Sequence, residues 1–456
     1  MTRKDRTEGI YSRREVLDES ERRQYCQLQL KELLSYAYRY SEDVKKRFDR
    51  AQFNVDKFRT LNDLKHIPII KKKELIFLQS MGPRLGGLLT KDLGELNRIF
   101  LSPGPIFDPE DRTEDYWGWT EGFYAAGFRA GDVTQITFNY HLAPAGLMFE
   151  EPLSNLSCAV IPAGPGNTNS QIEIMQKLRV TGYVGTPSYL MHLAQKAEES
   201  GLSLRKDLYL ETAFCTGEKL SEKMRTTLEK KFDCIMRQGY GTADVGCIGY
   251  ECYHKNGLHL SNRAFVEICH PDTGIPLKDG EVGEIVVTAF NKTYPLIRLA
   301  TGDLGYIDRA PCPCGRTSPR LGGIVGRVDT TARIKGMFVY PHQVEQVMAR
   351  FEDVKRWQIE VTNPAASTKW SSPSRPAASI RKTSCCTSSA RRSSCAPSSR
   401  FWPRAPCPRR SAPSKTSAPG TSPRTQRNDH QAGGDTASGL FHVRIRYEQF
   451  FPSCSQ

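Results

Sequence analysis

The sequence predicts an α/β protein with a large N-terminal domain of layered sheets and helices, which includes a small β subdomain. The start of a small α+β domain and a tail predicted to be disordered follow it. Three observations carry this prediction. Strand-like and helix-like segments alternate from about residue 113 to 240, short strands and turns replace them from 265 to 310, and the composition changes abruptly at Asn363.

The N-terminal part is predicted to be helical. Residues 20–50 and 60–78 carry helix-type spacing, with an apolar stripe formed by Leu28, Leu30, Leu33, Leu34 and Tyr38.

The alternating part is predicted to form a sheet covered on both faces, because strand and helix units of this length imply right-handed crossovers. Ligand sites in such sheets lie in loops beyond the strand ends. The predicted strands are residues 133–138, 157–164, 182–185, 208–215 and 234–241. Four helices are predicted between these strands. One ends near GFRAGD, one begins at Asn169 or Ser170, one follows Pro187, and one is capped by Ser221.

A β subdomain is predicted from FVEICH, GEIVVTAF and GYIDR, between residues 265 and 310. A hairpin-like segment at 326–345 then leads into the predicted helix VEQVMARF, at the start of the small domain.

The charge is concentrated in the tail. From Asn363 onwards there are 15 Lys or Arg and three acidic residues, so the first 362 residues are close to neutral, at about +2 of the whole-chain +14. A nucleic-acid partner is therefore not expected for the folded part, although the whole chain is basic.

Nine of the 14 cysteines precede residue 363 without a regular spacing, and no apolar run is long enough for a membrane span. We expect a cytoplasmic protein in a reducing compartment, without a membrane partner.

Four separated motifs occur in a recognisable order: GTPSYL at 185–190, YGTADVG at 240–246, PLIRLATGD at 295–303, and GRVDTTARIKGMFVYPHQVE at 326–345. Together they resemble the adenylate-forming superfamily, and its phenylacetate-CoA ligase branch in particular. The resemblance covers roughly residues 60–362. It implies an AMP-binding domain at 1–325, and a hinge with the start of the small C-terminal domain at 326–362. The implied cofactors are ATP, Mg²⁺ and coenzyme A, the substrate is a small, aryl or phenylacetate-like carboxylic acid, and related enzymes are often homodimers.

The resemblance implies roles for the nucleotide-binding residues. Asp303 would accept both ribose hydroxyls, a task for an ionised carboxylate, although Gly-Asp is also ordinary turn chemistry. Arg327 would help to hold the ribose, with a surface salt bridge as the alternative, and Asp329 falls at the hinge. Tyr240 would lie near adenine or be a core tyrosine. The further nucleotide contacts implied are Gly217 and Glu218 in CTGEKL, and Gly241 and Thr242 in the YGTADVG motif.

Two further residues are predicted to serve catalysis. Asp244 stands where the family usually has glutamate, and a carboxylate there would bind Mg²⁺. The aspartate is one methylene shorter, which shortens its reach to the metal. Ala243 replaces a usual hydroxyl, which removes one hydrogen bond to the nucleotide. His141 follows Tyr140 at the aromatic gate before the acid pocket, or else is a structural histidine.

The phosphate loop departs from the family pattern. The corresponding segment, SPGPIFDPE, contains no lysine, and Pro103 and Pro105 have no N–H to offer a phosphate. Ser102 and Gly104 remain as contacts. Either a divergent subgroup binds phosphate differently, or the first half-reaction is weak.

A structural zinc site is a separate expectation. Cys252 and His259 in ECYHKNGLHL, with Cys312 and Cys314 in PCPCGR, resemble a Cys/His cluster found in some family members. The alternative is that these are ordinary buried cysteines.

The tail at 363–456 contains 19 serines and a single leucine, Leu440, which favours disorder. Moving the frame by one base over residues 365–373 permits a strand-like Gly-Gly-Ile-Asp-Glu-Met-Val-Leu-Thr. We therefore hypothesise a truncated or frame-shifted C-terminal domain, real or from sequencing. No segment after 363 matches the family's small-domain lysine, whose loss costs roughly 10² to 10³ in rate.

Three functions stay open from the sequence. The first is an AMP-forming acid-CoA ligase, impaired in this chain if the lysine is missing. The second is a nucleotide-binding homologue with little or no ligase activity. The third is a nucleic-acid binder acting through the tail, for which charge is the only support.

Overall fold

The computed structural model describes residues 3–330, and after them 332–334, 337–339, 354–362, 379–381 and 442–449. The chain divides into two compact units, Met1–Asp329 and Thr330–Gln456. The division lies a few residues after the boundary predicted at 325, and directly after the predicted hinge residue Asp329. Among the described residues, none of the helices has the length and apolar character that a membrane span requires.

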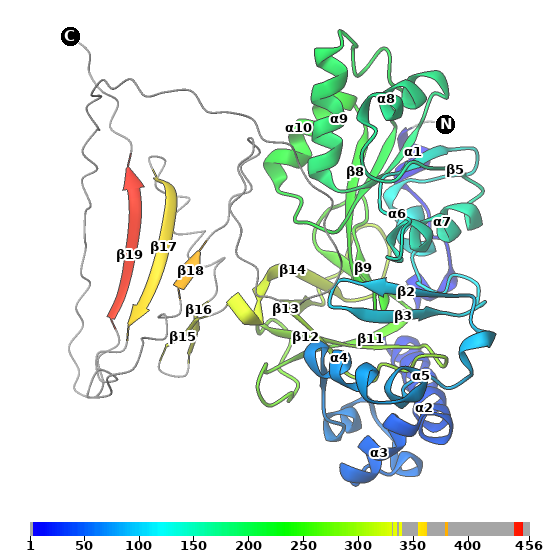
Figure 1. The fold of residues 1–456 in the computed structure, drawn as a ribbon, viewed down its shortest axis with the longest axis vertical. Helices are drawn as coiled ribbons and strands as arrows, with labels where there is room; N and C mark the ends of the chain where they lie inside the picture. The colour runs from blue at the N-terminus through cyan, green and yellow to red at the C-terminus, as the bar shows by residue number, and fades with distance from the viewer. Residues whose placement is uncertain are drawn as a thin grey trace, which may run out of the picture. The chain divides into compact units, whose positions relative to one another are not determined.

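Helices form the N-terminal layer of the first unit, at the lower end of Figure 1. Asp18 caps α2 by accepting a hydrogen bond from the Glu21 N–H, and Ser41 caps α3 through the Val44 N–H. The predicted apolar stripe is wrong at one residue, because Leu28 is 61% exposed while Leu30, Leu33 and Leu34 are buried. The helices of this layer are α2 (Glu19–Tyr40), α3 (Glu42–Arg50), α4 (Lys72–Met81) and α5 (Pro83–Gly87), with 3-10 turns at Val55–Lys57, Leu61–His66 and Leu93–Glu95. The helix α1 (Arg3–Thr7) lies apart from this layer, where Arg6 hydrogen-bonds to Gly127 and Asp132, and a 3-10 turn at Arg13–Val16 follows it.

The continuous helix expected at 60–78 is interrupted in the structure. A 3-10 turn ends at His66, and the two-residue strand β1 (Ile70–Lys71) pairs in parallel with β13 before α4 begins at Lys72. Pro68 explains the break, since the residue before a proline is disfavoured in helical geometry. This strand brings the start of α4 to the edge of the central sheet.

A parallel sheet forms one half of the first unit, as predicted, with the strand order β5-β4-β6-β7-β8. Ser221 caps α10 as expected, whereas α8 begins at Thr168, with Asn167 in the capping position in place of Asn169 or Ser170. The elements are α6 (Thr120–Ala126), β4 (Val133–Ile136), α7 (Ala145–Asn155), β5 (Ala159–Pro162), α8 (Thr168–Lys177), β6 (Gly182–Gly185), α9 (Pro187–Glu199), β7 (Thr212–Cys215), α10 (Glu222–Phe232) and β8 (Ile235–Thr242).

The strand order reverses at β4, since β5 lies on one side of it and β6 on the other. The carboxyl ends of β4 and β7 lead into the segments that contain residues 139–141 and 216–218, and residues 240–242 form the carboxyl end of β8. Open α/β sheets bind ligands outside these strand ends, near such a reversal. The fold therefore gathers several predicted nucleotide-binding segments along one edge.

Antiparallel strands extend the same sheet from β8, in the order β8-β9-β10-β14-β13-β12-β11. They form the predicted β subdomain, and their apolar faces pack with α4 into one core cluster that includes Leu75, Ile248, Ile285, Leu299 and Leu321. The strands are β9 (Gly246–Tyr250), β10 (Leu258–Leu260), β11 (Ala264–Cys269), β12 (Gly283–Ala289), β13 (Leu299–Asp308) and β14 (Arg320–Arg327), followed by a 3-10 turn at Val328–Thr330.

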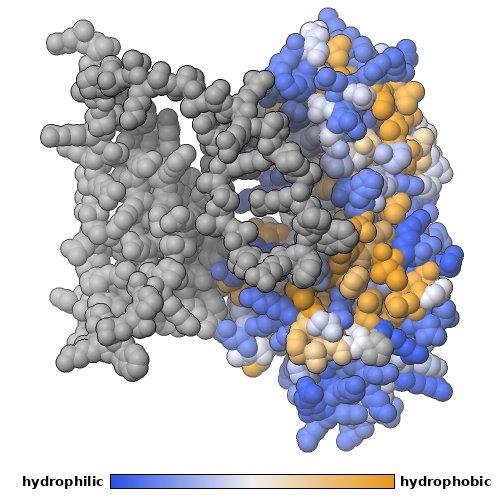
Figure 2. Space-filling view, in the orientation of Figure 1, coloured by the Kyte–Doolittle hydropathy of each residue, from blue (hydrophilic) through white to orange (hydrophobic). Residues whose placement is uncertain are grey.

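A separate hairpin, β2 (Arg98–Ser102) and β3 (Ile106–Glu110), contains the segment predicted as the phosphate loop. Figure 2 shows apolar residues gathered over the middle of the described face, where Figure 1 places this hairpin, α4 and α5. The exposed large apolar side chains on the hairpin and α4 are Phe77, Met81, Ile99 and Phe107. Such a patch is typical of a contact surface, but the expected homodimer stays a prediction.

The second unit contains two small antiparallel sheets. The hairpin predicted near 326–345 corresponds to β15 (Ala332–Ile334) and β16 (Met337–Val339), while β17 (Val354–Thr362) pairs with β18 (Ser379–Arg381) and β19 (His442–Gln449). The last two strands lie inside the tail that the sequence predicts to be disordered. The predicted helix at 344–351 and the rest of the tail lie outside the described residues.

Candidate nucleotide-binding site

Asp303 lies at the centre of a three-residue cluster. The Arg327 Nη1 donates to Asp303 Oδ1 at 2.8 Å, and the Tyr240 hydroxyl donates to Asp303 Oδ2 at 2.8 Å. The carboxylate side chain is only 16% exposed, whereas that of Arg327 is 50% exposed. Residues from three separated motifs thus converge on one carboxylate, as the predicted ribose site requires.

The strand register explains this convergence. Asp303 on β13 lies directly opposite Arg327 on β14, and Tyr240 reaches them from the end of β8. Gly302 has a φ of +81°, and a Cβ there would lie 3.1 Å from the Arg327 guanidinium, so glycine suits the TGD turn. The turn therefore sets the carboxylate and the guanidinium side by side.

Charge and burial shape the properties of the cluster. Burial, followed by the charge of Asp303, raises the pKa of Tyr240 well above its ordinary value, so the phenol keeps its proton as a donor. Partial burial lowers the pKa of Arg327, but the carboxylates of Asp303 and Asp329 outweigh this and raise it. Asp329 Oδ1 accepts a hydrogen bond from Arg327 Nε at 3.2 Å.

Asp244 follows β8 and is almost fully buried, with 1% of its side chain exposed. Lys72 Nζ lies 2.7 Å from Asp244 Oδ2, although neither carboxylate oxygen has a hydrogen bond of good geometry within the described part of the chain. We read this contact as an ion pair, because the distance is short and the charges are opposite. One face of the carboxylate is thus left for a further ligand.

A second buried carboxylate, Asp108 on β3, lies near Asp244. Asp108 is 1% exposed, and neither of its oxygens has a hydrogen-bond partner among the described residues. Burial, and then the charge of Asp244, raise the pKa of Asp108 to about 7. Sequence analysis did not predict a role for either Lys72 or Asp108.

Replacing Asp108 with asparagine is expected to stabilise the protein more at pH 8 than at pH 5. The folded-state pKa lies above the unfolded value of about 3.9, so the folded chain binds the extra proton between these values. Stability therefore falls as the pH rises from about 4 to 7, and stays lost above that range. Since each pKa unit corresponds to about 1.4 kcal/mol, the gain at pH 8 is on the order of a few kcal/mol.

Urea unfolding at both pH values, without added divalent metal, measures this difference. Asp92→Asn is the matched control, because that carboxylate is 74% exposed. An equal gain for Asp108→Asn at pH 5 and pH 8 would contradict the prediction.

The phosphate-loop hairpin uses its own polar groups internally. Ser102 is buried and donates to the Ile106 carbonyl at 3.4 Å across the turn. Gly104 has a φ of +156°, and a Cβ there would lie 2.9 Å from the Ile106 side chain. No described contact joins Ser102 or Gly104 to Asp303, Asp244 or Tyr240.

The remaining predicted nucleotide contacts lie at strand ends. Glu218 Oε1 accepts a hydrogen bond from the Ser188 N–H at 2.6 Å, at the start of α9, and Gly217 before it has a φ of +83°. Gly241 pairs with Cys247 on β9, and a Cβ there would lie 2.3 Å from the Gly246 carbonyl oxygen. The buried Thr242 hydroxyl has no partner among the described residues, so it remains able to bind a ligand.

His141 lies in an exposed loop after β4. Its backbone N–H donates to the Asn139 side chain at 2.8 Å, while no described hydrogen bond involves its imidazole. No described contact links His141 to Asp244, so a shared catalytic role stays a prediction.

Cys252, His259, Cys312 and Cys314 are brought together by β9, β10 and the loop before β14. One potential ligand atom from each lies within 4.8 Å of the others, with 3.6 Å between the sulfurs of Cys252 and Cys312 and 3.4 Å between Cys314 Sγ and His259 Nε2. Tetrahedral zinc with two thiolates holds sulfurs ~3.8 Å apart. Ser318 lies next to His259 Nδ1, where it can orient the ring. The geometry of the four residues fits a closed metal site.

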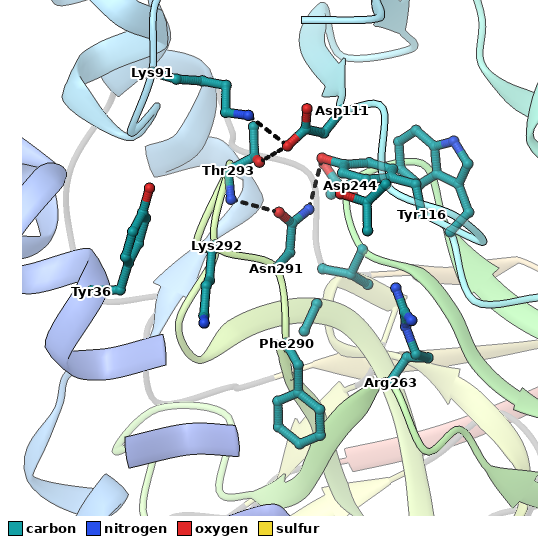
Figure 3. Close-up of a pocket in the computed structure, with 14 residues that line it drawn as sticks. Tyr36, Lys91, Asp111, Tyr116, Asp244, Arg263, Phe290, Asn291, Lys292 and Thr293 are labelled. Carbon is teal, nitrogen blue, oxygen red and sulfur yellow. Dashed lines mark hydrogen bonds and ion pairs between the residues drawn. The ribbon is translucent and has the colours of Figure 1, made fainter. Parts of the chain in front are cut away.

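A cavity of about 320 Å³ lies beside Asp244 and is drawn in Figure 3. Lys91 pairs with Asp111 at 2.7 Å, and Asn291 accepts from the Thr293 N–H and donates to the Tyr116 hydroxyl. The lining of the cavity also includes Tyr36, Trp117, Val245, Arg263 and Lys292. The Trp117 Nε1 is buried without a partner among the described residues. Of the predicted site residues, only Asp244 lines this cavity.

Comparison with known proteins is consistent with this geometry. Residues 127–291 match the family model of the AMP-binding enzyme. The phenylacetate-coenzyme A ligase of Thermus thermophilus is 31% identical over 365 residues, which cover 76% of this chain and 80% of that protein. The chain belongs to the phenylacetate-CoA ligase family.

A second relative agrees with this assignment, and a solved structure shares the fold. The phenylacetate-coenzyme A ligase of Escherichia coli is 28% identical over 351 residues, covering 73% of this chain and 77% of that protein. The solved structure of 2-hydroxyisobutyryl-CoA ligase, in complex with 2-HIB-AMP and CoA, has a TM-score of 0.70 at 23% identity, covering 75% of this chain and 83% of that one. This likeness shows that the fold is shared with adenylate-forming ligases.

Proposed function

We propose that this phenylacetate-CoA ligase family member activates a small aryl or phenylacetate-like carboxylic acid with ATP, and transfers the acyl group from the adenylate to coenzyme A. The observation that carries the proposal is the Asp303 carboxylate held between Arg327 and Tyr240. A carboxylate fixed by two donors, at the edge where the parallel strands end, suits recognition of a ribose diol. The names of the relatives supply the acid and the thiol acceptor.

The chain's own residues have distinct roles in this proposal. Asp303 and Arg327 hold the ribose, Tyr240 orients the carboxylate, and the segments of Gly217–Glu218 and Gly241–Thr242 form the walls around the base and the α-phosphate. Asp329, directly before the division between the two units, is the proposed hinge. Catalysis of adenylate formation depends mainly on positioning and on charge neutralisation, so fixed geometry is the main contribution of the protein.

Asp244 would hold the Mg²⁺. The fit is supported by a buried carboxylate whose two oxygens have no hydrogen bonds among the described residues, and by the preference of Mg²⁺ for hard oxygen ligands. When bound, the metal supplies neutralisation of the phosphate charge.

A structural zinc ion at Cys252, His259, Cys312 and Cys314 is part of the proposal. The contact between Cys252 and Cys314 lowers the pKa of Cys314 and raises the pKa of Cys252, so the pair shares a proton that a zinc ion would displace. The site would tie the β9–β10 turn to the loop before β14.

Pyrophosphate exchange with a panel of aromatic and short aliphatic acids tests the function. We expect acid-dependent exchange of labelled pyrophosphate into ATP, strongest with aryl or arylacetic acids. The second candidate, a nucleotide-binding homologue with little ligase activity, is favoured by the lysine-free hairpin with Pro103 and Pro105. ATP binding without exchange for any acid, in this chain and in a version with the corrected reading frame, would decide for that candidate.

A further inference from the structure

The phosphate-side surface of the proposed site contains two carboxylates and needs cations. The β2–β3 hairpin contributes no lysine, and its second strand, β3, carries the buried Asp108. Asp244 adds a second buried acidic group. An ATP triphosphate approaching these two groups would be repelled unless positive charge lies beside them, and the Mg²⁺ proposed at Asp244 would supply only part of that charge.

Lys72 supplies a positive charge at this position from a distant segment of the chain. The pairing of Ile70 with Leu299 and Lys71 with Ala300 fixes β1 on β13, three residues before Asp303. Lys72 is the next residue and the first of α4, and its Nζ lies 2.7 Å from Asp244 Oδ2. The backbone pairing therefore fixes the start of α4 next to the strand that carries Asp303, while the lysine side chain contacts the proposed metal carboxylate.

The ammonium group of Lys72 still has room to bind a ligand. Its side chain is 34% exposed, whereas that of Asp244 is 1% exposed. An ammonium has three donors, and Asp244 is its one partner among the described residues. Lys72 can thus keep its contact with Asp244 while donating to a phosphate oxygen.

We propose that Lys72 is the phosphate-binding lysine of this site, and that it contacts the β- or γ-phosphate of ATP in place of the lysine absent from the hairpin. The proposal rests on the proposed function, because it places the triphosphate next to Asp244. The same contact would hold pyrophosphate in the exchange reaction. AMP has no β- or γ-phosphate, so its binding does not depend on Lys72.

The test compares ATP, pyrophosphate and AMP binding to three full-length variants by calorimetry, with melting temperatures as the check on folding. Lys72→Ala is expected to weaken ATP and pyrophosphate binding about 10- to 100-fold, the size of a charge-assisted contact, while AMP binding changes less than about threefold. Lys72→Arg should retain most ATP affinity. Lys73→Ala is the matched control, because Lys73 is the exposed neighbour in the same helix turn.

The pattern across ligands separates binding from a structural role. Equal losses for ATP and AMP in Lys72→Ala would mean that the lysine only holds Asp244, and would overturn the proposal. Unchanged ATP affinity would overturn it as well. Failure of the proposed function is distinguishable, since the unmodified protein would then show no acid-dependent pyrophosphate exchange, whatever its affinity for ATP.

Discussion

Replacing Asp303 with asparagine is expected to weaken ATP and AMP binding by about a hundredfold or more, and to abolish pyrophosphate exchange. The carboxylate offers two acceptor oxygens, held by Arg327 and Tyr240 at 2.8 Å each, and asparagine offers only one acceptor and adds a donor. Two lost hydrogen bonds to a charged group correspond to about 3 to 6 kcal/mol. Calorimetric titration with AMP measures the effect without requiring turnover.

Asp329→Asn is the matched control for this variant. Asp329 contacts the same arginine, through Nε at 3.2 Å, but its side chain is 66% exposed. We expect this control to change nucleotide affinity less than about fivefold, since exposed ion pairs contribute little. If Asp303→Asn folds normally and binds AMP as tightly as the unmodified protein, Asp303 is an ordinary turn residue and the proposed site is wrong.

Local sequence signals predicted much of the parallel half of the fold. Ser221 and Pro187 mark the starts of α10 and α9 because capping and the fixed proline φ act within a few residues. The same reasoning failed at 60–78, where periodicity suggested a helix. The short strand β1 forms there because it pairs with β13, more than 200 residues away. Such pairing leaves no mark in the local pattern.

The candidate site shows the same limit. Asp303, Arg327 and Tyr240 were found because each stands in a recognisable motif, and the strand register then brings them together. Lys72 and Asp108 carry no such motif. The only signal for Lys72 is a run of three lysines, which usually indicates a solvated surface, and Asp108 is an acidic residue within the hairpin where the family pattern predicts a cation. Their meeting at Asp244 depends on tertiary structure.

Removal of the proposed zinc site is expected to produce a large loss of stability. The protein purified without chelator should contain about one zinc per chain, and His259→Ala or Cys312→Ser should lose most of it. Structural zinc contributes ~10 kcal/mol or more to the folding of small domains. In this larger unit we expect the melting temperature to fall by about 10 °C or more, since each kcal/mol corresponds to roughly 2 to 4 °C. Metal analysis together with calorimetry measures both effects.

Cys269→Ser is the control that distinguishes the loss of a zinc ligand from the loss of an ordinary buried thiol. Cys269 is fully buried in the same antiparallel sheet, but it does not belong to the four-residue cluster. This control should keep its zinc content, whatever it loses in packing. Without a metal, His259 and three neighbouring thiols in a mostly buried cluster would form only weak hydrogen bonds, and His259→Ala would cost no more than an ordinary core truncation. Zinc-free protein that melts at the same temperature with and without added zinc would therefore identify the cluster as ordinary buried cysteines.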